Sequence, residues 1–491
     1  MVNSELFKAF EFVSHLLTLF SLSWYFMTNM QWYSYKIERV LLKHHKGWWH
    51  FFYFGLPFIL YHFSDHFFWI FFYFGYLPIL YSWHKNLDRK LVLTWRVKRF
   101  FIILISLAVF GNTLCLIGGK CETFSLILPL IVATVGSMLI EKIIFRSFYK
   151  KAESKLKQMH NLKIITITGS YGKTSVKNFL YQVLSKKYRV YATPKSVNTT
   201  AGIVRDINES LSLDTDIYIV EAGARERGDI NEISQLVKHQ YGIITKIGPQ
   251  HIEYFGDILN IVKTKMEIKN SPYLKKLLLN IDLKGYKLEL KRDTYSIQFF
   301  GNEIIESEST LDGTKFKIRI DDEVFPFSTP VLGSFQSENL NSVILLAKEL
   351  GMSIDEIHQA IANLKPVPHR LEKITAGGKI IIDDGFNGNI DGMLEAFRLV
   401  SKHNGRKVLV TPGLVESSDE LNEKVAFEID ELFDVVIITG SLNRDFFKDK
   451  LISKVSTKIF LENKSQLESV LQKQTRAGDV ILFANDAPNF I

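Results

Sequence analysis

Cysteine is nearly absent from this chain. Of its 491 residues only two are cysteine, Cys115 and Cys121, and both flank one short loop. A disulfide framework or a cysteine–histidine zinc site needs several such residues at short, regular spacings, and the sequence has none. It also has no low-complexity tract and no internal repeat. At the N-terminus it lacks a basic segment followed by a small-residue cleavage site, so we expect no signal peptide.

Excess charge of one sign is also limited. The formal net charge is +8 and is unevenly distributed along the chain, which does not indicate nucleic-acid binding. The length is sufficient for about three domains. What the chain does have is aromatic residues, with 38 Phe and 19 Tyr concentrated in the first third. We therefore interpret residues 1–148 as an α-helical membrane domain of about five transmembrane helices.

Four apolar stretches lead to this count. Phe100 to Gly118 and Thr123 to Ile140 are each long enough to span a bilayer. Phe51 to Trp83 is too long for one helix, and Ser64-Asp65-His66 interrupts it, so we expect a tight hairpin of two short spans. Phe7 to Met27 is a weaker first span because it carries Glu11 and His15, and it could instead lie at the membrane interface.

Lysine and arginine are clustered in three segments around these stretches, which sets the expected orientation. The clusters are Lys36, Arg39, Lys43 and Lys46; Lys85, Arg89, Lys90, Arg96, Lys98 and Arg99; and Lys142, Arg146, Lys150, Lys151, Lys155 and Lys157. All three belong on the cytoplasmic side if the helices between them come in pairs. We expect a multi-pass membrane protein, with everything after Phe145 in the cytoplasm. Residues 150–157 are either a solvated helix or a segment attracted to anionic lipids.

The run Lys163 to Ser175, K-I-I-T-I-T-G-S-Y-G-K-T-S, is the most informative in the chain. A buried strand is followed by a tight glycine turn and by a segment with helical spacing. This strand, turn and helix N-terminus make a phosphate cradle, with backbone N–H groups facing the anion. Lys173 is expected to reach the terminal phosphates, and the Thr174 hydroxyl to bind Mg²⁺. The alternative is a purely structural glycine turn.

Strands and helices alternate after residue 160, which predicts a parallel sheet with ligands at the carboxyl ends of its strands. Glu221 and His251 each follow such a strand, as the phosphate loop does. Either residue alone is more often a capping or satisfied polar group, but together with Thr174 they favour a metal site. We assign residues 158–366 to a central P-loop domain, with an antiparallel portion between Tyr295 and Pro330. Residues 367–491 are assigned to a smaller Rossmann-like domain.

Five short segments occur in an order that resembles the Mur ligases, the ATP-dependent amide ligases of peptidoglycan precursor synthesis. They are G-S-Y-G-K-T from Gly169, V-E-A-G around Glu221, H-I-E-Y-F-G from His251 followed by K-T-K-M-E-I, H-R-L-E from His369, and D-D-G-F-N-G-N from Asp383. The resemblance covers roughly residues 160–491. The last segment points to the branch that adds D-Ala-D-Ala to a UDP-linked muramoyl tripeptide.

The resemblance implies cofactors and roles. ATP would be held by the loop and by a nucleotide-contact helix, through Gly169, Ser170, Tyr171, Gly172, Lys173, Thr174, Ser175, Gln336, Asn339 and Arg370. Two Mg²⁺ would be bound by Thr174, Glu221, His251 and Lys265, with Lys265 carrying a CO₂-derived carbamate. The catalytic set would be Lys173, His251, Lys265, Arg370 and Asp384. The substrates would contact Asn198, Thr199, Phe386, Asn387 and Asn389.

The sequence also departs from the family pattern. The expected membrane spans stand where the family has a uridine-binding domain, and His369 stands where glycine is usual before the arginine. One alternative is therefore a ligase of the same mechanism acting on a different, perhaps lipid-linked, wall precursor. Another is a membrane transporter or sensor whose soluble part is a regulatory nucleoside triphosphatase, which leaves the His251–Lys265 segment unexplained. The lipid bilayer and other wall-synthesis proteins are further expected partners.

Overall fold

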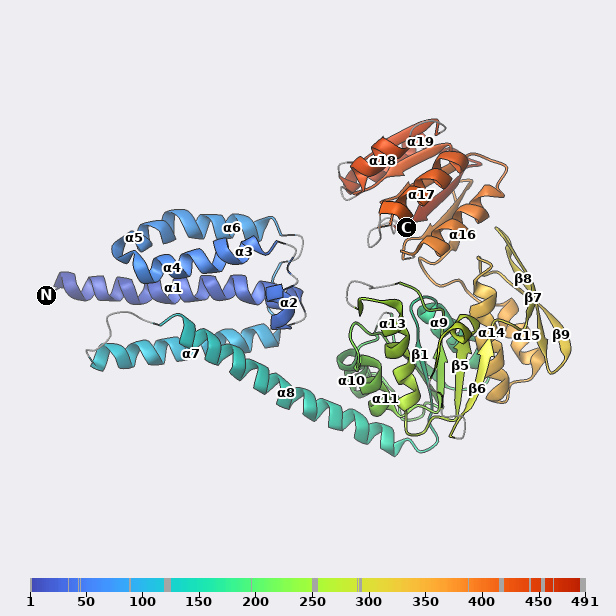
Figure 1. Ribbon diagram of the computed structural model, residues 1–491, viewed down its shortest axis with the longest axis horizontal. Helices are drawn as coiled ribbons and strands as arrows, with labels where there is room; N and C mark the ends of the chain where they lie inside the picture. The colour runs from blue at the N-terminus through green and yellow to red at the C-terminus, as the bar shows by residue number, and fades with distance from the viewer. Residues whose placement is uncertain are drawn as a thin grey trace. The chain divides into compact units, whose positions relative to one another are not determined.

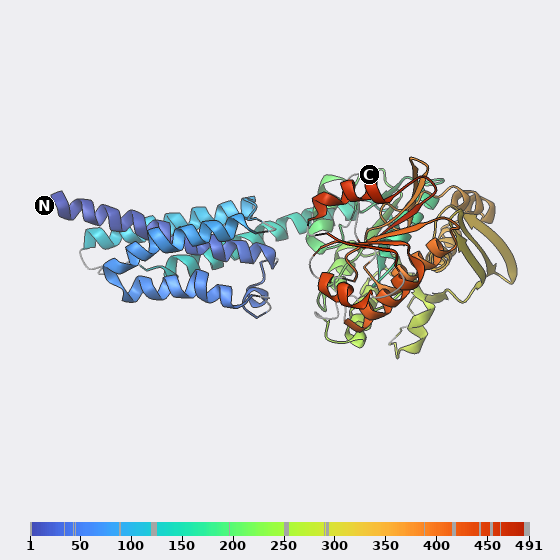
Figure 2. The ribbon, with the colours of Figure 1, turned by 90° about the horizontal axis from the view of Figure 1, so that it is seen from above.

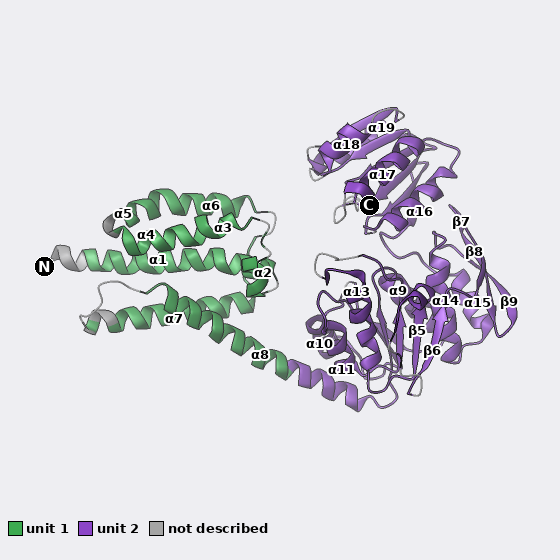
Figure 3. Ribbon diagram, viewed as in Figure 1, with its two compact units in different colours: residues 1–147 green, residues 148–491 purple. Residues whose placement is uncertain are grey.

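The computed structural model describes residues 2–33, 35–42, 44, 46–87, 90–118, 125–195, 197–249, 255–288, 290, 294–386, 388–414, 419–440, 443–451, 455–461 and 463–485. The chain divides into two compact units, residues 1–147 and residues 148–491 (Figure 3). Each unit has its own apolar core, and each is described by itself.

The first unit is entirely helical in its described part. Helices α1 (Val2–Trp32), α7 (Trp95–Gly118) and the start of α8 (Ile127–Gln158) run beside a helical hairpin (Figures 1 and 2). One arm of the hairpin is α3 (Trp48–His50), η1 (Phe51–Gly55) and α4 (Leu56–Phe63). The other arm is α5 (Asp65–Ile70), η2 (Phe71–Tyr76) and α6 (Leu77–Lys85), and a short α2 (Ile37–Leu42) follows α1. The predicted interruption is confirmed, because the helix breaks at Ser64.

Both arms of the hairpin contain a wide π-helical turn just before a proline. Pro57 follows η1 and Pro78 follows η2, each at the second position of the next helix. A proline has no N–H and clashes with the carbonyl four residues earlier, so the helix must widen there. The freed carbonyl of Tyr53 accepts a hydrogen bond from the Tyr76 hydroxyl at 2.9 Å. One arm thus compensates for the proline of the other.

Within the described residues, two helices are long and apolar enough to cross a membrane. They are Trp95–Leu114, with a mean hydropathy of 1.6, and Ile127–Gln158, with 2.0. The expectation of about five spans is therefore not confirmed. Helix α1 has 31 residues but carries a buried stripe of polar side chains, and the hairpin arms are divided into short segments. The stripe consists of Ser14, His15, Thr18, Ser21, Ser23, Thr28 and Asn29.

The second unit begins with the end of α8 and contains a six-stranded parallel sheet in the order β2-β3-β1-β4-β5-β6. The strands are β1 (Lys163–Thr168), β2 (Val190–Ala192), β3 (Ile217–Glu221), β4 (Tyr241–Ile244), β5 (Lys276–Asn280) and β6 (Ser296–Phe300). On one face α9 (Lys173–Leu184), α14 (Gln336–Glu349) and α15 (Ile354–Ala362) share its core. Figure 1 shows α10 (Thr200–Glu209), α11 (Asp229–Val237) and α13 (Ile258–Lys265) on the other side.

The segment predicted to be antiparallel is divided between two sheets. Strand β6 continues the large sheet in parallel with β5, and Phe300 at its end is fully buried in the core. Only β7 (Ile304–Thr310), β8 (Gly313–Ile320) and β9 (Glu323–Thr329) form an antiparallel meander. The prediction was thus wrong for β6, because this short edge strand has partly buried residues on both faces and lacks an alternation that would assign it to either sheet.

The C-terminal part holds a second six-stranded sheet in the order β10-β11-β15-β12-β13-β14, in which β10 alone is antiparallel to its neighbour. The strands are β10 (Glu372–Ala376), β11 (Lys379–Asp384), β12 (Lys407–Thr411), β13 (Val435–Ile438), β14 (Thr457–Phe460) and β15 (Val480–Ala484). Helices α16 (Ile390–Ser401), α17 (Asp419–Leu432), α18 (Arg444–Lys450) and α19 (Leu467–Gln474) pack on it. The predicted domain limits at residues 148, 158 and 366 stay predictions.

Candidate nucleotide site

The glycine turn predicted from sequence lies between β1 and α9, at the carboxyl end of the parallel sheet. Gly172 has a φ of +83°, and a Cβ placed there would lie 2.6 Å from Oδ1 of Asn339. Gly169 has a φ of +144°, and its Cβ would lie 2.0 Å from Oγ1 of Thr245. Both positions therefore require glycine, so that the loop can pass close to its neighbours and deliver the first turn of α9 to an anion.

The loop is fixed from the next strand of the sheet. The backbone N–H groups of Ser170 and Tyr171 both donate to the carbonyl of Lys246, at 3.0 and 3.1 Å. The Tyr171 ring packs against Gly248, leaving no space for a Cβ there. Burial, with a contribution from the nearby carboxylate of Asp391, raises the pKa of Tyr171 to about 12, so its hydroxyl is neutral.

Lys173 folds back on its own loop. Its Nζ donates to the carbonyls of Gly169 and Ser170, at 2.8 and 2.7 Å. Burial lowers the pKa of Lys173 to about 8, with attraction from Glu221 and repulsion from Arg370 acting in opposite directions. A terminal phosphate placed here would offset the burial, because an opposite charge nearby favours the ammonium form.

Glu221, the last residue of β3, lies beside this loop, where three polar side chains contact its carboxylate. It is 2% exposed, and its carboxylate accepts from the Thr174 hydroxyl at 3.2 and 3.3 Å. Lys177, one turn further along α9, forms an ion pair with it at 3.0 Å, and Nδ2 of Asn198 donates to it at 3.4 Å. Thr174 and Glu221 therefore lie together, as expected of two ligands of one cation.

Lys265, the last residue of α13, is 4% exposed. Burial lowers its pKa to about 7, repulsion from Lys173 lowers it further, and Asp229 and Glu267 oppose the shift. Glu267 in turn accepts hydrogen bonds from the backbone N–H groups of Gly228 and Asn231 at the start of α11. A buried amine with a pKa near 7 is about half neutral at pH 7, and the neutral form is the nucleophilic one.

Arg370 comes from the C-terminal part of the unit and approaches the same loop. Burial lowers its pKa, while the carboxylates of Asp384 and Glu221 act in the opposite direction. Asp384 is 1% exposed, and its Oδ1 accepts from the backbone N–H of Leu371 at 3.1 Å. Arg370, Lys173 and Glu221 are thus mutual electrostatic neighbours, although almost 200 residues separate the arginine from the loop.

The remaining predicted residues are distributed around this centre. Gln336 and Asn339 are buried at the start of α14 and are hydrogen-bonded to each other at 2.8 Å. Ser175 is buried in the first turn of α9. Thr199 caps α10, accepting from the N–H of Gly202, and Asn389 caps α16, accepting from Gly392. Phe386 is 60% exposed. His251 and Asn387 lie outside the described residues.

Sequence reasoning missed Lys177 and Lys246. Lys177 is separated from Lys173 by one helical turn, so the helical spacing of α9 could have identified it. Lys246 follows β4 and braces the loop through its carbonyl, while its Nζ lies 3.6 Å from the carboxylate of Asp391 in α16. No pattern in the sequence marks that pairing.

The residues present fit a nucleotide and a divalent cation. Two glycines allow the loop to lie close against Thr245 and Asn339. Lys173 and Arg370 are close enough to repel each other, and both interact with Glu221. The oxygen donors of Thr174 and Glu221 are of the type that Mg²⁺ prefers. The described ligand set for a second cation is incomplete, because His251 is not among the described residues.

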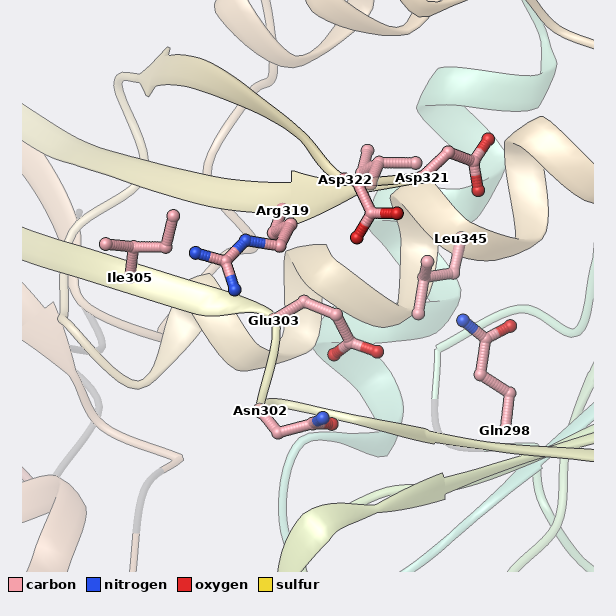
Figure 4. Close-up of a pocket in the computed structure, with 9 residues that line it drawn as sticks. Gln298, Asn302, Glu303, Ile305, Arg319, Asp321, Asp322 and Leu345 are labelled. Carbon is pink, nitrogen blue, oxygen red and sulfur yellow. The ribbon is translucent and has the colours of Figure 1, made fainter.

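A separate cavity of about 320 Å³ lies between β6, the β7–β9 meander and α14 (Figure 4). Arg319, Glu303 and Asn302 converge on it, and Asp321 and Asp322 border it at the tip of the β8–β9 turn. It contains none of the residues predicted for nucleotide, metal or substrate. We therefore place the candidate site at the glycine loop.

The fold and the site together define a P-loop α/β protein with a second Rossmann-like sheet that supplies an arginine to the loop. Comparison with known proteins finds a family model that matches part of this fold. Residues 167–347 match the model of the Mur ligase middle domain.

Relatives of known name match a longer stretch of the chain than the family model does. UDP-N-acetylmuramoyl-tripeptide–D-alanyl-D-alanine ligase of Bacillus subtilis is 28% identical over 349 residues, 65% of this chain and 72% of the relative. The ligase of the same name from Escherichia coli is 25% identical over 275 residues, and the chain spans 61% of its length. MurF of Thermotoga maritima, solved in complex with ADP, has a TM-score of 0.60 at 24% identity, covering 70% of this chain and 80% of that one.

Proposed function

We propose that this protein is an ATP-dependent amide ligase that adds D-Ala-D-Ala to UDP-MurNAc-tripeptide in peptidoglycan precursor synthesis. The observation that carries the proposal is the convergence of Lys173, Glu221, Lys265 and Arg370 on one glycine loop. Glu221 and Lys265 are buried and Lys173 and Arg370 are half-buried, and a bound nucleotide or cation would balance the charges of Lys173, Arg370 and Glu221. The similarity to the Bacillus subtilis and Escherichia coli ligases supports the choice of substrates.

The proposed reaction has two chemical steps. The carboxylate of the muramoyl tripeptide attacks the γ-phosphorus of ATP, forming an acyl phosphate and releasing ADP. The amine of D-Ala-D-Ala then attacks the acyl carbon, and the tetrahedral intermediate expels phosphate and loses a proton. Lys173 and Arg370 stabilise the charge on the transferred phosphoryl group, and Asp384 and the Leu371 turn orient Arg370.

The proposed cation site consists of Thr174 and Glu221, with His251 and a carbamate on Lys265 completing a second one. Mg²⁺ would neutralise phosphate charge at these positions. Lys177 holds the Glu221 carboxylate beside Thr174, and Asn198 contacts it from the substrate loop. The lowered pKa of Lys265 supports carbamate formation, since the neutral amine is the form that adds CO₂.

The proposed substrate contacts lie at two helix N-termini. Asn198 and Thr199 precede α10 and would contact the muramoyl peptide, while Phe386, Asn387 and Asn389 precede α16 and would contact the incoming dipeptide. Thr199 and Asn389 also cap these helices through their side chains. If the capping oxygen of Thr199 or Asn389 also accepts a hydrogen bond from a substrate, the substrate is positioned relative to the N-terminus of that helix.

We further propose that unit 1 is a multi-span membrane domain of the inner membrane, with the ligase unit in the cytoplasm. Its support is the two apolar helices α7 and α8, and the many large apolar side chains that unit 1 exposes, such as Phe63 and Phe74, at 83% and 84%. A reporter active only in the cytoplasm should be active when fused to the C-terminus and silent when inserted at Gly119. The reverse result would contradict this orientation.

The second candidate is a ligase of the same mechanism acting on a different or lipid-linked wall precursor, which the apolar helices of unit 1 favour. One assay separates the candidates. Phosphate release by the detergent-purified full chain should require ATP, UDP-MurNAc-tripeptide and D-Ala-D-Ala together, and should stop when any one is omitted. Activity only with a lipid-linked acceptor would support the second candidate, and no ATP-dependent activity with either acceptor would contradict both.

A further inference from the structure

Two residues without glycine's freedom adopt left-handed backbone conformations on either side of Arg370. His369 has a φ of +61° and Leu371 a φ of +50°. Such conformations are uncommon for residues other than glycine, and for leucine they are distinctly unfavourable. They persist only where surrounding contacts impose them, and such positions concentrate at functional sites. The turn that carries Arg370 is therefore held in place by its neighbours.

The contacts that hold this turn come from the end of β11. Nδ1 of His369 donates to Oδ2 of Asp383 at 2.7 Å, and Asp383 is 1% exposed. The His369 carbonyl accepts from the N–H of Phe386 at 3.2 Å, and the Phe386 ring packs edge-on against the imidazole with centroids 4.7 Å apart. On the other side of Arg370, the N–H of Leu371 donates to Asp384 at 3.1 Å.

These contacts determine where Arg370 points. The adjacent carboxylates Asp383 and Asp384 each fix one neighbour of the arginine, so the turn cannot relax without breaking a buried hydrogen bond. We propose that His369 is a positioning residue, which through Asp383 holds Arg370 against the nucleotide loop. The proposal rests on the ATP-dependent function proposed above.

A metal-binding role is the main alternative for this cluster. Ligand atoms of His369, Glu372 and Asp383 lie within 4.8 Å of one another. However, each of these groups already has a protein partner. Oε2 of Glu372 accepts from the His369 N–H at 3.2 Å, and Oδ1 of Asp383 accepts from Gly385 at 3.0 Å. Because these atoms already accept or donate hydrogen bonds within the protein, the cluster is better explained as a clamp, a set of contacts that holds the turn around Arg370, than as a metal site.

The test is a double-mutant cycle between His369 and Arg370 on the full-length protein, with binding of a non-hydrolysable ATP analogue and Mg²⁺ measured by calorimetry. Glycine adopts the left-handed turn freely, so His369→Gly removes the side-chain clamp without adding strain. We expect the analogue to bind about tenfold more weakly to His369→Gly, as for loss of one hydrogen bond to a charged group. His369→Asn, which tolerates the turn and offers an N–H to Asp383, should restore affinity to within about threefold.

The decisive comparison is made in the Arg370→Gln background, where adding His369→Gly should cause no further loss. An equal loss in both backgrounds, or wild-type affinity in His369→Gly alone, would overturn the proposal. If His369→Gly does not fold, the same cycle with Asp383→Asn tests the clamp from its other side. Asp322→Gly is the matched control, since Asp322 has a φ of +68° at the β8–β9 turn outside the candidate site. It should bind the analogue as the wild type does.

Two further measurements distinguish a metal site, and a failure of the proposed function, from a failure of the positioning proposal. Metal analysis of the purified wild type should find no ion that is lost in His369→Gly, and a stoichiometric ion lost in that variant would overturn the clamp in favour of a metal site. Failure of the wild type to bind any ATP analogue would overturn the proposed function and this inference together. Normal wild-type binding with additive effects would overturn the inference alone.

Discussion

The two units of the chain place polar and apolar side chains in opposite ways. Unit 1 exposes large apolar residues such as Phe63, Phe74 and Ile117, each at about four-fifths of its surface, and buries uncharged polar residues of α1. Within the described part of unit 2 the central strands such as β3 and β15 bury continuous apolar runs, and the buried charges include Lys177, Glu221 and Lys265 near the glycine loop. Buried polar groups are costly unless they are paired, so each unit uses them only where partners exist.

The partners themselves differ between the units. In unit 1, Ser14 and His15 bond to the hydroxyls of Tyr73 and Tyr61, and Asn29 bonds to His44. The first two bonds join α1 to the hairpin, and the third joins α1 to the segment between α2 and α3. Such side-chain hydrogen bonds hold helices together where apolar packing alone does not specify the partner. In unit 2 the corresponding contact is a charged pair, Lys177 with Glu221. This difference agrees with the proposal that unit 1 locates the enzyme and unit 2 carries out the chemistry.

Of the substitutions that test this comparison, removal of the Lys173 side chain is expected to have the largest effect. Lys173→Ala should lower kcat by about 10³-fold or more, because the loop loses its cation for the transferred phosphoryl group. Steady-state phosphate release measures the effect. The matched control is Lys186→Ala, an exposed lysine just beyond α9, which should retain wild-type kcat. Comparable rates in both variants would contradict the assignment of the chemistry to this loop.

Replacing Lys265 should have the next largest effect. Lys265→Ala should lower kcat about 10²-fold, as expected for loss of an electrostatic group in the site, and short carboxylates should partly restore it. Exposed Lys263→Ala on the same helix is the control. Full activity of Lys265→Ala would contradict the carbamate.

The lowered pKa of Lys265 gives this prediction a pH dependence. With a pKa of about 7 instead of 10.5, the neutral amine that adds CO₂ becomes the main form as pH rises through 7. At constant dissolved CO₂, the ¹³C carbamate signal of the wild type should therefore increase between pH 6 and 8, with the largest change near 7. A signal that rises only above pH 9 would indicate an ordinary exposed lysine.

Truncation tests the boundary between the units. The end of α8 belongs to unit 2, where Lys155 donates to the carbonyl of Ile207, Glu153 pairs with Lys238, and Asn208 donates to the carbonyl of Phe148. A fragment of residues 148–491 should fold and bind ATP. A fragment of residues 160–491 should be less stable by about 2–3 kcal/mol through loss of these bonds, measured by urea denaturation. Equal stability would show that α8 does not contribute to unit 2.

The longer fragment also tests what unit 1 does. If unit 1 serves only to locate the enzyme, fragment 148–491 should use UDP-MurNAc-tripeptide almost as efficiently as the full chain does. Its kcat/KM for this precursor should remain within about threefold of the value for the full chain, which is no more than the loss of one weak contact would cause. We favour this outcome, because apolar helices offer few groups for a charged nucleotide sugar. A much higher KM for this precursor, with normal ATP binding, would instead assign precursor recognition to unit 1.

The last prediction concerns the pH dependence of stability. His239 is fully buried, its Nε2–H donates to the carbonyl of Ile268, and burial lowers its pKa from 6.5 to about 3. Below pH 6.5 the unfolded chain binds a proton that the folded chain does not, so stability falls as pH decreases from 6.5 towards 3. The free energy of unfolding of fragment 148–491 should fall by up to about 1.4 kcal/mol per pH unit from this residue. His239→Gln, which keeps an N–H donor, should reduce that slope.

Local patterns in the sequence were enough to predict several secondary-structure elements of this protein. The run from Lys163 to Ser175 predicted the strand, the glycine turn and the helix, because turn geometry and strand burial depend on neighbouring residues. The break at Ser64 was equally local. Local sequence did not determine the number of expected membrane spans. Helix α1 has the length of a span, but it carries a polar stripe, and the partners of Ser14 and His15 in that stripe come from the hairpin.

Only the tertiary structure decided which distant groups meet. Strand order places β3 and β4 on either side of β1, and this brings Glu221 and the Lys246 carbonyl to the glycine loop. The meeting of Arg370 with Lys173, and the clamp of His369 on Asp383, depend on a turn in left-handed conformations that no residue pattern marks. Sequence periodicity reports which side of an element is buried, whereas the partner across the site is fixed by how the sheets and their connections pack.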